Sequence, residues 1–221
     1  MTPDLIDRLA LVVVTDPDCA GRDLVDVARA ALRGGAGALQ LRAKQESTRE
    51  MVELGRRLKA ETEAAGALLF VNDRVDVALV IGADGAHLGD DDLPLEAARR
   101  IAPPPFLIGR SVDTEAEARV AERAGADYVG AGPVHATPSK LDAAPAIGVR
   151  GIGAIAAATG IPVVAIGGVD EETSEAVARA GAAGVAVIRA VMQAADPESA
   201  ARALVAAVRR GSEKRKAKSE K

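Results

Sequence analysis

Short runs of apolar, often β-branched residues alternate along this chain with longer amphipathic stretches that are rich in alanine. Short apolar runs bounded by turn residues are typical of buried strands, and apolar positions spaced three or four apart are typical of helices that pack on a sheet. The pattern predicts strands over residues 9–14, 38–41, 67–71, 85–88, 106–108, 128–130, 162–166 and 184–187. It predicts helices over residues 24–33, 48–65, 75–81, 95–102, 114–124, 151–158, 172–180 and 196–209.

Strict alternation of strands and helices favours parallel pairing, and units of roughly 20–35 residues suit a closed barrel of this size. We therefore predict an α/β protein with one domain, a (β/α)8 TIM barrel over residues 1–210. The alternative is a doubly wound open sheet, which would favour a glycine fingerprint after the first strand. Residues 15–18 read Thr-Asp-Pro-Asp and carry no such fingerprint.

The last residues differ in composition from the rest. Residues 211–221 read GSEKRKAKSEK, with Ala217 as the one apolar side chain. Such a segment has little apolar surface to offset the entropy of ordering, so we predict a disordered, charged C-terminal tail.

Composition excludes several classes of function. The 221 residues carry a formal net charge of −4, no Trp, one Tyr and two Phe, so neither a basic surface nor base stacking supports nucleic acid as a partner. Cys19 is the one cysteine, which excludes a disulfide within the chain and fits a reducing compartment. No apolar run reaches membrane-spanning length, so we expect a cytoplasmic protein without a membrane partner. The sequence is compatible with a homo-oligomer.

Polar side chains follow the predicted second strand. In a barrel the active site lies at the carboxyl ends of the strands, and strand alternation puts Gln40, Arg42 and Lys44 on one side and Leu41 and Ala43 on the other. Two cations and an amide at this rim would suit a pyrophosphate. A solvated strand end explains the motif equally well.

Acidic residues follow the third and fourth strands, as Asn72-Asp73 and Asp90-Asp91-Asp92. Carboxylates at adjacent strand tips can share a cation, and oxygen ligands completed by substrate phosphates are typical of Mg²⁺. Any one of these residues could instead be a helix N-cap. Acids on two adjacent tips beside the cationic second strand favour the metal.

The next two connections are polar as well. Residues 109–111 read Gly-Arg-Ser and are predicted to form a small turn, and residues 131–147 form a long loop, of the kind that often covers a binding site. In that loop Thr137, Ser139 and Lys140 offer two hydroxyls and a cation to an anion. His87 and His135 are too few and too dispersed for a histidine metal site, and we interpret both as structural.

A phosphate site is indicated after the last two strands. Gly167-Gly168 follows the seventh strand, and Ile188-Arg189 opens a helical turn after the eighth. Loops at these places recurrently bind phosphate in barrels of this kind, because glycine lets backbone N–H groups approach an oxyanion. With the predicted pyrophosphate site, this indicates two phosphorylated small-molecule substrates.

These segments, in order, resemble the thiamine-phosphate synthase family over nearly the whole chain except the tail. The resemblance is carried by Gln-x-Arg-x-Lys, Asn-Asp-Arg-x-Asp, Ala-Asp-Gly-x-His-Leu-Gly-x-x-Asp-Leu-Pro, Gly-x-Ser, Gly-Ala-Asp-Tyr-x-Gly-x-Gly-Pro-Val, Thr-x-Ser-Lys, Gly-Gly-Val and Gly-x-Ala-Val, at residues 40–44, 72–76, 83–94, 109–111, 125–134, 137–140, 167–169 and 184–187. It implies a transferase of thiamine biosynthesis. The enzyme would join 4-amino-2-methyl-5-(diphosphooxymethyl)pyrimidine to a thiazole phosphate, carboxylated or plain, and release pyrophosphate by a dissociative, Mg²⁺-assisted substitution.

The resemblance also implies roles for single residues. The metal ligands would be Asp73 and Asp92, and the catalytic residues Arg42, Lys44, Ser111 and Lys140. The pyrimidine pyrophosphate would contact Gln40, Leu41, Arg42, Ala43, Lys44, Asn72, Ser111 and Lys140. The thiazole phosphate would contact Thr137, Pro138, Ser139, Gly168, Ile188 and Arg189.

The chain departs from the family pattern at three positions. Arg189 stands where the family usually has Ser. The family also commonly has a His near the position of Asp113 and an aromatic residue near the position of His135. None of these is a proposed metal or pyrophosphate ligand, so the departures bear on substrate affinity. The alternatives are a thiazole tautomerase and a non-catalytic phosphate-binding barrel. A tautomerase would not need the metal and pyrophosphate ligands, so it is disfavoured by the presence of Asp73, Asp92, Arg42 and Lys140. Turnover would exclude the non-catalytic barrel.

Overall fold

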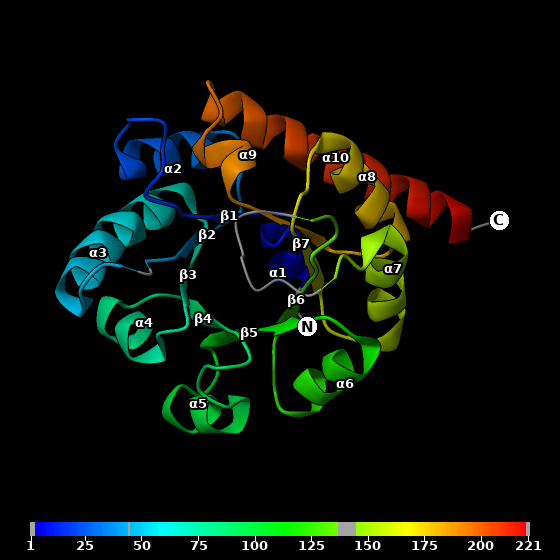
Figure 1. Ribbon diagram of the computed structural model, residues 1–221, viewed down its shortest axis with the longest axis horizontal. Coiled ribbons are helices and arrows are strands. Elements are labelled where there is room, and N and C mark those ends of the chain that lie inside the picture. Colours follow the sequence, from blue (N-terminus) through cyan, green and yellow to red (C-terminus); the bar gives the residue numbers. More distant parts are fainter. Residues whose placement is uncertain (1–2, 44, 137–144, 220–221) are drawn as a thin grey trace.

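A computed structural model describes residues 3–43, 45–136 and 145–219, and it shows strands enclosed by a ring of helices (Figure 1). The strands are β1 (Leu11–Val14), β2 (Ala38–Leu41), β3 (Leu68–Asn72), β4 (Gly85–Leu88), β5 (Leu107–Val112), β6 (Tyr128–Ala131), β7 (Val163–Ile166) and β8 (Gly184–Val187). The helices are α1 (Pro3–Arg8), α2 (Leu24–Arg33), α3 (Thr48–Ala65), α4 (Val75–Ile81), α5 (Leu95–Ile101), α6 (Glu115–Arg123), α7 (Gly148–Ala158), α8 (Glu171–Ala180), α9 (Arg189–Met192) and α10 (Pro197–Ser219).

The sheet is a closed barrel in which each strand pairs in parallel with the next and β8 pairs with β1. This confirms the predicted (β/α)8 architecture. The pairing of Leu11 with Val185 leaves no open edge between the first and last strands, so the doubly wound alternative is wrong.

Strand alternation divides the core into two layers. Outward-facing side chains such as Leu39, Val71 and Ile108 pack under the helices, whereas inward-facing ones such as Val12 and Phe70 fill the barrel. Leu5 of α1 packs against the inner cluster, and α1 is visible through the middle of the ring in Figure 1. The barrel is therefore filled at the α1 end, and its hollow part lies at the other.

Local sequence fixes the helix ends. Ser47 and Thr114 each accept a hydrogen bond from the backbone N–H three residues on, and Glu50 and Glu117 bond back to the cap, so both are complete capping boxes. The C-terminal caps Gly66 and Gly82 have φ of 67°, a left-handed conformation that favours glycine.

The C-terminal segment differs from the prediction of a disordered tail, because α10 continues to Ser219. Gly211 fits closely against α8, where a Cβ would lie 2.3 Å from the Glu175 carbonyl oxygen. Lys214 forms an ion pair of 2.6 Å with Glu175, and Arg215 donates to the Gly181 carbonyl. The tail therefore gains contacts with α8 that its low apolar content did not indicate.

Glu175→Gln is expected to loosen the end of α10. Hydrogen bonds from Lys214 and Arg210 lower the pKa of the Glu175 carboxyl, so its stabilising contribution is present near neutral pH and is lost as acid protonates it. Because the pairs are at the surface, Tm should fall by only about 2 °C at pH 7, with a smaller difference at pH 4. Hydrogen exchange should rise in residues 212–219. Glu213→Gln, which removes a carboxylate without an ion pair to any described residue, is the control; equal exchange in both variants would contradict this account.

Among the described residues, no helix combines the length and the apolar character needed to cross a membrane.

Candidate active site

A cavity of about 350 Å³ opens at the carboxyl ends of the strands. Its walls come from every strand or from the residues directly after it. They include Val12, Val14, Gln40, Arg42, Asn72, Asp73, His87, Gly89, Ser111, Asp113, Tyr128, Gly130, Pro133, Val164, Ile166, Gly167, Gly168, Val169, Ala186, Ile188 and Arg189. This is the rim at which the sequence predicted the active site.

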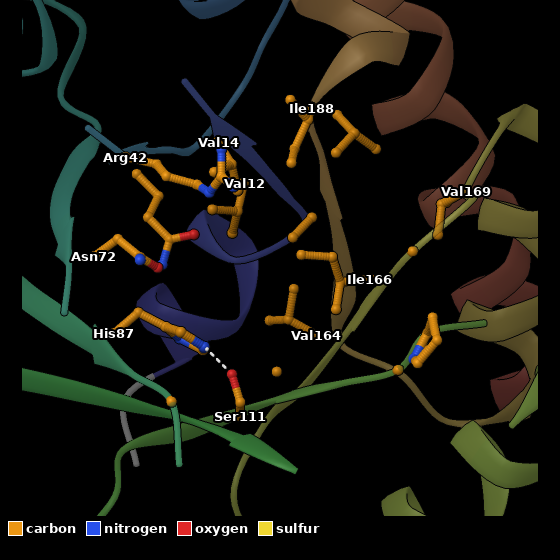
Figure 2. Close-up of a pocket in the computed structure, with 18 of the residues that line it drawn as sticks. Val12, Val14, Arg42, Asn72, His87, Ser111, Val164, Ile166, Val169 and Ile188 are labelled. Carbon is orange, nitrogen blue, oxygen red and sulfur yellow. Dashed lines mark hydrogen bonds between the residues drawn. The ribbon is translucent and has the colours of Figure 1, made fainter. Parts of the chain in front are cut away.

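The two sides of the cavity differ in character. Arg42, Asn72, His87 and Ser111 lie on one side, and Val164, Ile166, Val169 and Ile188 lie on the other (Figure 2). The polar side comes from β2 to β5, and the apolar side from β7, β8 and the residues after them. A flat heterocycle could therefore rest on an apolar wall while hydrogen-bonding groups face its other side.

On β2, alternation separates the predicted substrate ligands. Gln40 and Arg42 line the cavity, as predicted. The Arg42 backbone N–H donates to Thr15 Oγ1 at 3.0 Å, and its guanidinium lies 3.6 Å from Asp16 Oδ2. Leu41 is buried in the outer core, against which Ala43 also packs. The side chains of Leu41 and Ala43 are thus turned away from the substrate, so only their main chain could contact it.

The two predicted metal ligands lie at adjacent strand tips on one rim. Asn72 of β3 is paired with His87 of β4, and the Asp73 N–H donates to the His87 carbonyl at 2.8 Å. Asp92 accepts a hydrogen bond of 2.6 Å from the N–H of Gly89, which lines the cavity. The predicted arrangement of the two acids on one rim is therefore present.

Asp73 adopts a strained backbone conformation, with φ of 66°. Asp tolerates this left-handed region better than most non-glycine residues, but strain of this kind is concentrated at functional sites. Within the described residues, no three His, Cys, Asp or Glu side chains are grouped to hold a metal. The oxygen donors of Asp73 and Asp92 fit Mg²⁺, which usually takes one or two carboxylates and completes its shell with phosphate oxygens and water.

Arg110 holds the loop that carries Asp92. It donates to the Gly89 carbonyl and forms an ion pair of 2.6 Å with Asp90. The predicted turn at residues 109–111 is wrong, because β5 continues through them to Val112. The longer strand places Ser111 inside the cavity and Arg110 outside it, where it can reach the β4 loop.

The predicted phosphate loops also line the cavity. Gly167 and Gly168 have φ of 96° and 64°, and a Cβ at Gly168 would lie 2.7 Å from His135 Cβ. Both positions therefore favour glycine on conformational and steric grounds. Ile188 and Arg189 line the cavity on the same side, where they follow the neighbouring strand β8 at the start of the single-turn helix α9. Lys44, Thr137, Pro138, Ser139 and Lys140 lie outside the described residues.

His87 was interpreted from the sequence as a structural residue, but the structure places it in the cavity wall. It lines the cavity, with Nε2 3.0 Å from Ser111 Oγ and Nδ1 3.1 Å from the Tyr128 hydroxyl. The sequence holds a signal for this position. Residues two apart on a strand point to the same face, so His87 shares the face of Gly85, which is paired with the inward-facing Phe70. His135, by contrast, is exposed, and its Nε2 lies 3.4 Å from Thr173 Oγ1.

Comparison with known proteins identifies the family. The family described as thiamine monophosphate synthase matches residues 11–191. This chain belongs to that family. A thiamine-phosphate synthase from Roseiflexus castenholzii is 52% identical over 198 residues, which cover 89% of this chain and 87% of the relative. One from Archaeoglobus fulgidus is 48% identical over 206 residues, covering 93% and 96%.

A solved structure places the whole barrel within the thiamine monophosphate synthase family. Thiamine phosphate pyrophosphorylase from Pyrococcus furiosus superposes with a TM-score of 0.87 at 44% identity, covering 94% of this chain and 98% of that one. A 3-hexulose-6-phosphate synthase structure, with a TM-score of 0.67 at 21% identity, shares the fold alone. The resemblance found in the sequence motifs is thus confirmed, and the chain is a transferase of thiamine biosynthesis.

Proposed function

We propose that this enzyme joins 4-amino-2-methyl-5-(diphosphooxymethyl)pyrimidine to a thiazole phosphate and releases pyrophosphate, giving thiamine phosphate. The observation that carries the proposal is the cavity in which Arg42 and Asp73 lie on one side and Gly167-Gly168 with Arg189 on the other. It offers separate anion-binding groups for two phosphorylated substrates, on either side of a space for two rings.

The reaction breaks the bond between the pyrimidine methylene and the diphosphate oxygen before the thiazole nitrogen attacks. The protein must therefore stabilise a leaving group whose negative charge grows, which is electrostatic work by groups already in place. Arg42 is suited to this because Thr15 accepts a hydrogen bond from its backbone N–H and its side chain is only 20% exposed. Lys44 and Lys140 are proposed to add positive charge at the same diphosphate.

Asp73 and Asp92 would hold Mg²⁺ against the diphosphate. When bound, the ion neutralises charge on the diphosphate oxygens. Gln40, Asn72 and Ser111 orient the pyrimidine from the polar side, and the aliphatic side chains opposite them exclude water from the reacting methylene. Thr137, Pro138, Ser139, Gly168, Ile188 and Arg189 are proposed to hold the thiazole phosphate.

Turnover tests the function directly. Purified protein incubated with both substrates and Mg²⁺ should yield thiamine phosphate and one equivalent of pyrophosphate, and chelation of the metal should abolish both. Omission of the thiazole phosphate should stop product formation. Absence of thiamine phosphate under saturating conditions would reject the proposal, and product formation unaffected by chelation would reject the metal.

Arg189→Ala is expected to weaken binding of the thiazole phosphate. Arg189 lines the cavity beside the Gly167-Gly168 loop and is exposed, so its guanidinium can form a charge-assisted hydrogen bond to the phosphate. Loss of that bond should raise KM for the thiazole phosphate about 10-fold and change kcat little. Arg179→Ala, on the exposed surface of α8, is the control. An unchanged KM would exclude Arg189 from the phosphate site.

A further inference from the structure

Three neighbouring strands place His87, Tyr128 and Ser111 together in the cavity wall. His87 is in register with Gly109 of β5, Gly109 is in register with Tyr128 of β6, and Ser111 is in register with Gly130. A Cβ at Gly109 would lie 2.2 Å from Tyr128 Cζ and 2.6 Å from His87 Nδ1. A Cβ at Gly130 would lie 2.9 Å from His87 Cε1. The two glycines therefore create the space that the imidazole occupies.

The imidazole connects the other two side chains. Its Nδ1 lies 3.1 Å from the Tyr128 hydroxyl and its Nε2 lies 3.0 Å from Ser111 Oγ, the contact drawn in Figure 2. Tyr128 is 2% exposed and its ring packs against Phe70, with centroids 5.2 Å apart. No side-chain polar atom of the described residues is buried without a partner.

The burial of Tyr128 determines the direction of both hydrogen bonds. Desolvation, with a smaller contribution from Asp127, raises the pKa of the phenol, so the hydroxyl stays protonated. A buried O–H needs an acceptor, and His87 Nδ1 is the side-chain acceptor that the structure places next to it. A phenol that donates to Nδ1 leaves the proton of the neutral ring on Nε2. Nε2 then donates to Ser111 Oγ, and the Ser111 hydrogen is left to point elsewhere.

We propose that His87 is a positioning residue, held by Tyr128 in the Nε2–H tautomer, which makes the Ser111 hydroxyl a hydrogen-bond donor to the pyrimidine diphosphate substrate. The proposal rests on the proposed function. Ser111 lines the cavity, so a hydroxyl that already accepts from His87 presents its O–H to an acceptor atom of the substrate. Without His87 the hydroxyl could rotate, and its hydrogen could point to other partners.

Kinetics of matched variants test the role of His87. His87→Gln can place an N–H donor near the position of Nε2, whereas His87→Met fills similar space without a donor. His87→Met should lower kcat/KM for the pyrimidine diphosphate about 10-fold and leave KM for the thiazole phosphate within about 2-fold. His87→Gln should recover most of the loss. Equal losses in both variants, or an equal rise in both KM values, would contradict positioning of Ser111.

The tautomer can be measured without substrate. The chain has two histidines, so ¹⁵N labelling of the His135→Gln variant leaves His87 as the one imidazole signal. We expect a protonated Nε2 and an unprotonated Nδ1 at pH 7.5. Tyr128→Phe removes only the hydroxyl and should shift the ring toward a mixture of tautomers, with kcat/KM for the pyrimidine diphosphate falling in parallel. A protonated Nδ1 in the parent protein would overturn the proposal.

The two readouts separate the possible failures. If the parent protein forms no thiamine phosphate, the proposed function fails, and the ¹⁵N spectrum still decides the arrangement of Tyr128 and His87. If turnover is normal and Nδ1 is protonated, only the inference about His87 fails. Thermal melts of the His87→Met, His87→Gln and Tyr128→Phe proteins show whether a lost rate reflects unfolding.

Discussion

Asp73→Asn is expected to lower Mg²⁺-dependent pyrophosphate release by about 10²-fold or more, because a Mg²⁺ ion at the leaving group would lose one of its two proposed carboxylate ligands. Asn tolerates the positive φ of 66° at this position, so the strained backbone should persist. It can also accept the hydrogen bond that Asn72 Nδ2 now donates to Asp73 Oδ1. The substitution therefore removes charge while preserving the local structure.

Release of pyrophosphate over a series of Mg²⁺ concentrations measures this effect. Isothermal titration of pyrophosphate and Mg²⁺ into each protein adds a reading that is independent of turnover. Asp92→Asn should give a similar loss, since its side chain can still accept from the Gly89 N–H. Asp91→Asn, on the exposed loop between β4 and α5, provides the control. Full rates in both Asp73→Asn and Asp92→Asn would reject the metal assignment.

The sequence was sufficient for the architecture because barrel strands carry a strong local signal. Runs such as Leu39–Leu41 on β2 are buried on both faces, and their boundaries were predicted to within a few residues. β5 was the exception. Gly109 resembled a turn residue, although the structure requires glycine there because Tyr128 and His87 occupy the space of a side chain. This requirement comes from a contact among β4, β5 and β6, and the sequence of β5 alone cannot predict it.

The same limit applies to the ends of the chain and to single site residues. Residues 211–219 have almost no apolar side chains, and their helical structure comes from contacts with α8, such as the Lys214–Glu175 pair. The cavity-lining positions of Gln40 and Arg42 followed from alternation alone. Alternation could place the His87 side chain on the cavity face of β4, but its contacts with Tyr128 and Ser111 involve other strands and could not be predicted from β4 alone.

Lys140→Ala is expected to lower kcat about 10²-fold and to leave KM for the thiazole phosphate within about 3-fold. Lys140 lies outside the described residues, but both flanks of its segment are anchored beside the cavity. The His135 N–H donates to the Gly167 carbonyl at 2.9 Å, and the Ile147 N–H donates to the Pro133 carbonyl at 2.9 Å. A residue only five positions from His135 is within chain reach of the cavity. A cation at that place would neutralise charge on the departing diphosphate.

Single-turnover rates and separate KM values for the two substrates check this expectation. Lys140→Arg should retain more activity than Lys140→Ala, because arginine keeps the positive charge. It should not restore full activity, because a planar guanidinium replaces the compact ammonium group. Lys216→Ala, at an exposed position of α10, serves as the control. A raised KM for the thiazole phosphate with an unchanged kcat would instead assign Lys140 to the thiazole phosphate site.

A double variant tests whether Lys140 and Asp73 act on one group. If both stabilise the charge of the departing diphosphate, the first substitution already removes much of the benefit of the second group. The combined loss in Asp73→Asn/Lys140→Ala should then be well below the product of the two single losses. Losses that multiply would mean that the two residues act independently, and the diphosphate would not be their common target.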